Sequence, residues 1–138
     1  MAVTALYNTD VTSVGGRVGH VRSADGALDA HLDKPAALGG PAEAQLNPET
    51  LFAAAYAACF GGAVGAVAKD RDVTGFTIRA SVGLGKEDSG GFALSVTLTG
   101  HFPNLDAAEA QKVMHMAHQV CPYSKATRNN IDVHLAVE

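Results

Sequence analysis

The chain contains two cysteines, Cys59 and Cys121, and a thiolate in either place could act as a nucleophile. The first residues show no basic start followed by an apolar stretch, so we expect no signal peptide and a cytoplasmic location. In a reducing compartment a cysteine pair is more often catalytic or redox-active than a structural staple. The alternative is that both residues are small apolar fillers of the core, because free cysteine is among the most buried residue types. From composition and pattern alone, we give these two interpretations about equal weight.

A reactive Cys59 needs a positive charge close to its sulfur, because burial by itself favours the neutral, inert thiol. Arg17 is the candidate, since an arginine stays charged when desolvated and this one lies in a glycine-rich segment, residues 15–19. A buried arginine in turn needs a carboxylate, and Glu49 is the candidate in an otherwise uncharged region. The alternatives are an exposed strand position for Arg17 and simple complementarity to a helix dipole for Glu49.

A metal site is a competing interpretation of the second cysteine. His115, His118 and Cys121 recur at intervals of three residues, so neighbours among them could share a metal ion. However, His115 lies off the apolar face of the helix expected here, and no fourth ligand is suggested nearby. We therefore expect no metal, and we expect His118 to be a hydrogen-bonded residue beside the apolar face.

The first cysteine lies in a long, alanine-rich segment that we expect to be helical. Asn47 suits the N-cap, Pro48 the first helical position and Glu49 the positive end of the helix dipole. No charged residue follows until Lys69. The length is at the lower limit for a membrane span, but small residues dominate the segment and the rest of the chain carries amphipathic strands. We expect a core helix hidden on all sides.

The second cysteine ends the apolar face of an amphipathic helix, for which Asp106 is the expected N-cap, Glu109 completes a capping box and Pro122 is the expected stop. That face consists of Ala110, Val113, Met114, Ala117, Val120 and Cys121. Alternating apolar residues and turn signals predict strands over residues 3–12, 17–22, 27–32, 76–84, 92–98 and 131–137. The predicted fold class is α+β, with antiparallel sheets around a long buried central helix and one amphipathic helix.

Length and charge exclude several classes of protein. At 138 residues, positions 1–138 are expected to form a single domain. The formal net charge is −4, and the ten basic residues are scattered rather than clustered. A dedicated nucleic-acid binder or a polybasic membrane anchor is therefore not expected.

Two segments resemble the cysteine motifs of the organic hydroperoxide resistance proteins, the Ohr branch of the Ohr/OsmC family: residues 47–60 around Cys59 and residues 118–130 around Cys121. The Gly-Gly-Arg-x-Gly segment at 15–19 and the Leu-Gly-Gly segment at 38–40 fall in matching order, so the resemblance covers essentially the whole chain. Val18 departs from it, because the family usually has Asp after the arginine, and so does Ala55, where Gly is common.

The resemblance implies a thiol peroxidase that reduces alkyl and fatty-acid hydroperoxides to alcohols, with no metal or organic cofactor. It implies that Cys59 is the peroxidatic cysteine and Cys121 the resolving one, that the two form a disulfide, that Arg17 activates the thiolate and that Glu49 holds Arg17. It also implies an intertwined OsmC-like homodimer and a dithiol reductant carried by lipoylated proteins. The apolar lining expected at the site consists of Phe52, Tyr56, Phe60 and Phe102.

Helix geometry adds one expectation about the dimer. Glu49 and Cys59 on one continuous helix are about 15 Å apart along its axis and roughly 80° apart around it. Glu49 therefore cannot easily bind an arginine that lies at Cys59 of its own chain. We expect Arg17 and Glu49 of the other subunit to complete each site at the subunit interface. Gly61 and Gly65 are the residues expected to let the two central helices approach closely. The alternatives are a non-catalytic protein that binds an apolar ligand and a thiol-based redox sensor.

Overall fold

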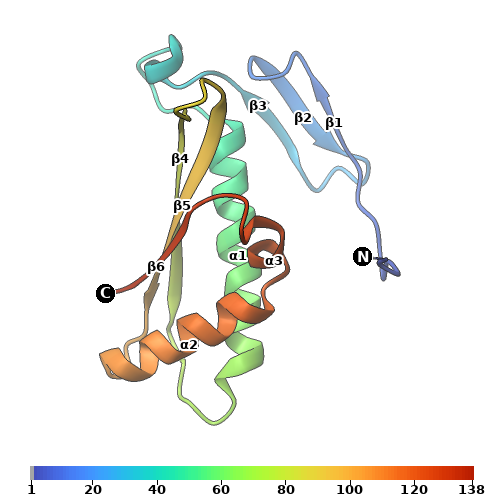
Figure 1. Cartoon of the computed structure of the whole chain (residues 1–138). Helices are drawn as coiled ribbons and strands as arrows, with labels where there is room; N and C mark the ends of the chain where they lie inside the picture. Colours follow the sequence, from blue (N-terminus) through green and yellow to red (C-terminus); the bar gives the residue numbers. More distant parts are fainter. Residues whose placement is uncertain (1) are drawn as a thin grey trace. The chain divides into compact units, whose positions relative to one another are not determined.

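The structure, a computed structural model, describes residues 2–138. The chain divides into two compact units, with the boundary in the sequence between Pro48 and Glu49. The first unit holds a three-stranded sheet, and the second holds another three-stranded sheet with the α-helices (Figure 1). All strand pairs but one are antiparallel among the described residues, and the predicted α+β class is confirmed. A short 3₁₀ helix, Ala36–Leu38, lies in the predicted loop between the last strand of the first unit and the first α-helix.

The first sheet is an antiparallel meander of β1 (Val11–Val14), β2 (Gly19–Ser23) and β3 (Asp29–Leu32), in that order. The strand predicted over residues 3–12 is wrong in its first part, because pairing begins only at Val11, opposite Ser23. Alternation of apolar residues marks a segment that could be a strand, but a strand also needs a partner for its backbone groups. The predicted turn between β2 and β3 is confirmed, with the Gly26 N–H donating to the Ser23 carbonyl at 3.0 Å.

Arg17 lies in the turn between β1 and β2 and not at the predicted start of a strand. Gly15 and Gly16 have φ angles of 81° and 62°, which side chains with a Cβ rarely adopt. A Cβ at Gly19 would lie 1.8 Å from the Val14 carbonyl oxygen, so the end of the turn requires glycine as well. The glycines that mark this segment in the sequence therefore build a tight loop that carries Arg17.

The second sheet has the order β4 (Thr77–Lys86), β5 (Phe92–His101) and β6 (Val133–Val137). β4 and β5 form the predicted antiparallel hairpin, in register from Thr77 opposite His101 to Lys86 opposite Phe92. β6 is the one departure from antiparallel pairing among the described strands, because it runs parallel to β5. Parallel neighbours need a crossover connection, which α2 (Ala107–Val120) and α3 (Pro122–Thr127) provide.

The junction between α2 and α3 carries the second cysteine. Asp106 caps α2 as predicted, accepting a hydrogen bond of 2.8 Å from the Glu109 N–H. Pro122 follows the end of α2 as predicted, but it also begins α3, which the sequence interpretation missed. Proline is favoured at the first position of a helix, because its ring presets φ and the missing N–H is not needed there. Val120 is 55% exposed and does not belong to the buried face of α2.

The helix α1 (Pro48–Ala68) begins at the predicted proline and has two different faces. One face is buried in the core of the second unit, together with residues of β5 and α2, through Tyr56, Phe60, Ala63, Val64 and Ala68. The expected core helix is confirmed for this face, but the expectation that the helix is hidden on all sides is wrong for the single chain. The other face is uncovered in the single chain and consists of small residues: Ala54, Ala58, Gly62, Gly65 and Ala66. Although α1 is long and apolar enough to cross a membrane, with a mean hydropathy of 1.8, its large side chains pack in the core as in a soluble protein.

Candidate active site

The structure brings the two sulfur atoms together, although the cysteines are far apart in the sequence. Cys59 lies in the middle of α1, and Cys121 lies between α2 and α3. The helix α3 lies beside α1 in Figure 1. The Cys121 thiol donates to the Cys59 Sγ over a distance of 3.8 Å. Both cysteines are reduced; Cys59 is partly buried and Cys121 is fully buried. Because a disulfide is about 2.05 Å long, the sulfurs need to approach each other by less than about 2 Å to bond.

The surroundings of Cys59 within the second unit favour its protonated form. Burial is the main cause that raises the pKa of Cys59, and the Cys121 thiol raises it further. The backbone N–H of Tyr123 acts in the opposite direction by donating a hydrogen bond to the sulfur. Tyr123 is the first residue of α3 that has an N–H to offer, because Pro122 has none. A nucleophilic Cys59 therefore needs a further positive charge, as the sequence analysis predicts.

Arg17 and Glu49, the residues predicted to supply and hold that charge, lie in different units of the chain. Arg17 is partly buried in the loop between β1 and β2, and Glu49 is partly buried in the first turn of α1. Both residues have interaction partners. Their proposed action on Cys59 stays a prediction.

The four aromatic residues predicted to line the site have different environments. Phe52 is partly buried and packs edge-on against Tyr56, with ring centroids 6.0 Å apart. Phe60 is 0% exposed and Phe102 is 5% exposed, with Phe102 stacked on Phe76. Phe60, Phe102 and the equally buried Tyr56 pack in the core of the second unit, and the role of these aromatic residues in substrate binding stays a prediction. The period of an apolar pattern shows which residues face inward, and it does not separate a core from a ligand pocket.

The sequence interpretation missed a cluster of buried hydroxyl groups beside the cysteines. The Tyr56 hydroxyl lies 2.9 Å from Ser124 Oγ and 3.1 Å from Thr127 Oγ1, and all three side chains are buried. His118 Nδ1 lies 2.7 Å from the same Ser124 Oγ, which confirms the prediction of a hydrogen-bonded histidine. The signal in the sequence was the group of hydroxyl residues that follows Pro122, namely Tyr123, Ser124 and Thr127, but their partners cannot be identified unless α3 is predicted.

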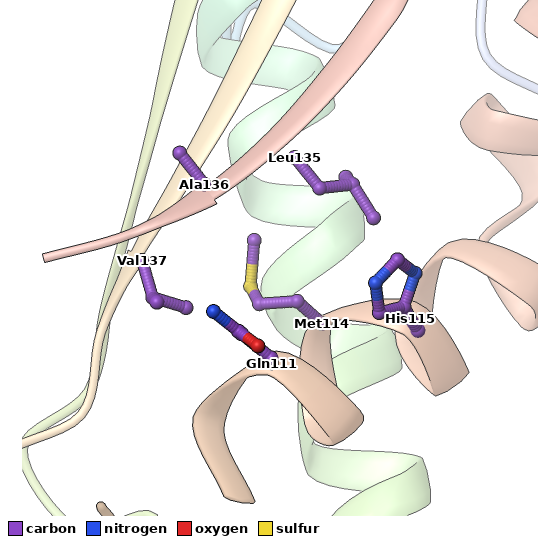
Figure 2. Close-up of a pocket in the computed structure, with 6 residues that line it drawn as sticks. All are labelled: Gln111, Met114, His115, Leu135, Ala136 and Val137. Atoms are coloured by element: carbon purple, nitrogen blue, oxygen red, sulfur yellow. The ribbon is translucent and has the colours of Figure 1, made fainter. Parts of the chain in front are cut away.

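A separate cavity of about 260 Å³ lies between α2 and β6 (Figure 2). It is lined by Gln111, Met114, His115, Leu135, Ala136 and Val137, so neither cysteine contributes to it. Across residues 2–138, no group of three or more His, Cys, Asp or Glu side chains is arranged to hold a metal ion. His115 faces this cavity, whereas His118 is engaged with Ser124.

Comparison with known proteins places this geometry in a family. Residues 40–136 match the model of the OsmC-like proteins. The organic hydroperoxide resistance protein OhrB of Bacillus subtilis is 46% identical over 136 residues, which cover 97% of this chain and 99% of that protein. An organic hydroperoxide resistance protein of Xanthomonas axonopodis pv. citri is 49% identical over 135 residues, covering 96% of this chain and 94% of its own length. The crystal structure of an organic hydroperoxide resistance protein from Legionella pneumophila superposes with a TM-score of 0.90 at 42% identity, covering 98% of this chain and 99% of that one.

Proposed function

The chain belongs to the organic hydroperoxide resistance branch of the OsmC-like family. From this membership and from its two neighbouring sulfur atoms, we propose that the protein is a thiol peroxidase that reduces organic hydroperoxides to alcohols. The observation that carries the proposal is the 3.8 Å separation of a partly buried and a fully buried thiol. Two cysteines placed only to fill a core have no need to meet, whereas a peroxidatic and a resolving cysteine must.

Cys59 is the proposed peroxidatic residue, because it is the less buried sulfur of the pair. Its thiolate attacks the hydroperoxide oxygen that is distal to the organic group. A sulfur–oxygen bond forms, the oxygen–oxygen bond breaks, and the alkoxide leaves and takes up a proton to become the alcohol. Cys59 is left as a sulfenic acid.

Cys121 is the proposed resolving residue. Its sulfur attacks the sulfenic sulfur of Cys59, a disulfide forms, and the displaced hydroxide leaves with the Cys121 proton as water. An external dithiol, which we propose to be a dihydrolipoyl group on a lipoylated protein, then reopens the disulfide by exchange. No metal or organic cofactor enters either step.

Arg17 is the proposed source of the charge that ionises Cys59, and Glu49 the carboxylate that holds Arg17. The raised pKa of Cys59 within its own unit supports the need for this charge, because a protonated thiol is a poor nucleophile. A guanidinium would stabilise both the thiolate and the charge that develops on the peroxide oxygens. Val18, which follows Arg17 where the family usually has Asp, leaves the loop to be fixed by its glycines.

A homodimer with its two active sites at the subunit interface is the proposed working form, in which residues 1–138 act as one domain. The uncovered small-residue face of α1 supports this, because an added Cβ at Gly62 or Gly65 meets no atom within 4 Å in the single chain. Gly61, in contrast, faces Phe76, so Gly62 replaces it in the proposed contact. Exposed apolar side chains in the first unit also favour a partner: Val3, Leu6, Tyr7, Val11 and Val14.

Alkyl and fatty-acid hydroperoxides are the proposed substrate class, and the cytoplasm the proposed location. Phe52, about two turns before Cys59 on α1, offers a partly buried ring to an organic group. Hydrogen peroxide has no apolar group to bury there, so it is expected to be a poorer substrate.

The test is anaerobic mixing of the reduced protein with cumene hydroperoxide while thiols and peroxide are counted. We expect two thiols lost for each peroxide consumed, no consumption by Cys59→Ser, and turnover when dihydrolipoamide is supplied. A protein that consumes no peroxide but retains a bound fatty acid after Cys59→Ser would be a binding protein, and the proposal would be wrong. Oxidation of both thiols without turnover in the presence of the dithiol would instead indicate a redox sensor.

A further inference from the structure

The buried hydroxyl cluster forms a closed set of four hydrogen bonds next to the two sulfurs, all within the second unit. Tyr56 contacts Ser124 Oγ at 2.9 Å and Thr127 Oγ1 at 3.1 Å. Ser124 Oγ contacts His118 Nδ1 at 2.7 Å, and the Thr127 hydroxyl donates to the Ser124 carbonyl at 3.2 Å. Tyr56 and Ser124 are 0% exposed, so water does not compete for these bonds.

The number of protons fixes the direction of every bond. Each hydroxyl carries one proton, so Tyr56, Ser124 and Thr127 supply three protons for four bonds. Thr127 uses its proton on the Ser124 carbonyl, which means that Tyr56 donates to Thr127. Ser124 must then donate to Tyr56, and the remaining bond, between His118 Nδ1 and Ser124 Oγ, requires a proton on Nδ1.

His118 is therefore held with Nδ1 protonated. Burial is the main cause that lowers the pKa of His118, and the charges of Arg128 and His115 lower it further, so the ring is neutral at neutral pH. A neutral ring with a proton on Nδ1 has none on Nε2. Arg128 fixes the same residue from another side, because its Nη2 donates to the His118 carbonyl at 2.6 Å.

The cluster joins the two turns that carry the sulfurs. Tyr56 lies three residues before Cys59, on the preceding turn of α1, and Ser124 lies three residues after Cys121, in the first turn of α3. The hydrogen bond between Tyr56 and Ser124 therefore links the part of α1 that carries Cys59 to the start of α3, which follows Cys121. His118, in the last turn of α2, ties the same serine to the helix on the other side of Cys121.

We propose that Ser124 and His118, with Tyr56, are positioning residues for the resolving step, which hold the Cys121 sulfur against Cys59. The inference rests on the proposed peroxidase function. In that step the bond between the sulfurs forms while the bond between sulfur and oxygen breaks, and the hydroxide leaves with the Cys121 proton as water. When Cys121 is displaced, a second hydroperoxide reaches the sulfenic acid first and oxidises it to the sulfinic acid, releasing a second alcohol.

The test separates the two chemical steps in single-turnover experiments with cumene hydroperoxide. Quenched samples of reduced protein give the rate of peroxide loss and the rate of disulfide formation, and mass spectrometry gives the sulfinic fraction at excess peroxide. For Ser124→Ala and His118→Leu we expect peroxide loss within about twofold of the wild type and disulfide formation slowed about tenfold, with more sulfinic acid. His118→Asn should restore the rate, because its side-chain amide places a donor near the position of Nδ1. Ser81→Ala, at an exposed strand position of the same unit, is the matched control.

Three outcomes would overturn the inference. Disulfide formation at the wild-type rate in Ser124→Ala, with normal peroxide loss, would remove the positioning role and leave the peroxidase function standing. Parallel slowing of both steps would show a merely structural role. A ¹⁵N NMR spectrum that places the His118 proton on Nε2 at neutral pH would refute the proton assignment. A wild-type protein that consumes no hydroperoxide would refute the proposed function itself.

Discussion

A leucine at position 62 gives opposite results for a monomer and for a dimer that packs through α1. In the single chain an added Cβ at Gly62 meets no atom within 4 Å, and the residue is exposed. If that face stays in water, Gly62→Leu stabilises the helix by about 1 kcal/mol, because glycine is the poorer helix former by that amount. If the face packs closely against its copy, the added side chain is overpacked at a cost of about 1–3 kcal/mol per site.

The expected result is a weaker dimer. Each dimer contains two copies of the substitution, so the cost is roughly 2–6 kcal/mol, and the dissociation constant rises by a factor of roughly 30 or more. Sedimentation over a range of concentrations measures this constant, and cumene hydroperoxide turnover at the same concentrations shows whether activity follows the dimer.

Gly61→Ala is the matched control on the same helix. Its added Cβ lies 3.7 Å from the Phe76 ring, an ordinary contact inside the unit. It should therefore raise the free energy of unfolding by about 1 kcal/mol without changing the dimer. If Gly62→Leu also raises stability and leaves both association and turnover unchanged, α1 does not form the interface and the argument is refuted.

Three further predictions concern the charges and the sulfurs. Cys121→Ser should still reduce one hydroperoxide per Cys59 to give sulfenic acid, and a second hydroperoxide should oxidise that acid to sulfinic acid, both of which are seen in mass spectra; retention of steady dithiol-driven turnover would contradict the resolving role. Arg17→Ala should slow alkylation of Cys59 by iodoacetamide at pH 7 about tenfold or more and shift the pH profile upward, since one unit of pKa is worth about 1.36 kcal/mol; an unchanged profile would exclude Arg17. Because the pKa of His118 is lowered below its ordinary value of 6.5, the unfolded chain binds a proton first as the pH falls. Its contribution to stability is therefore present above pH 6.5 and is lost as the pH falls through the lowered pKa, so His118→Asn should flatten the decline of urea midpoints on acidification.

The elements around the cysteines were predictable where one local signal decided the structure. Asn47 and Pro48 marked the start of α1, and Asp106 marked the start of α2, because caps and first-turn prolines act within a few residues. The hairpin of β4 and β5 followed from its alternation. Local signals did not show that β6 runs parallel to β5, because direction depends on the path of the intervening crossover.

The reactive groups of the candidate site could be predicted from the sequence, but the residues that surround them could not. Cys59 and Cys121 were singled out by residue type and motif, but their contact depends on α3, which starts where Pro122 seemed only to end a helix. The hydroxyl cluster was missed for the same reason, since Ser124 and Thr127 have no recognisable partner until α3 is placed against Tyr56. The spacing of Phe60 and Phe102 predicted their burial, which the structure confirms, but it did not show which residues they pack against.

The order of the proposed reaction follows from the unequal burial of the two sulfurs. Cys121 is fully buried and Cys59 only partly, so a hydroperoxide or a dithiol from solution reaches Cys59 more easily. Partial burial still raises the pKa of Cys59, so its own surroundings favour the neutral thiol. A positive charge close to the sulfur is therefore needed to make Cys59 reactive. In the proposed dimer this charge comes from Arg17, so the sulfurs are positioned by one part of the chain and activated by another. Dilution below the dissociation constant should then abolish peroxide reduction while leaving the two thiols near enough to be joined by a general oxidant.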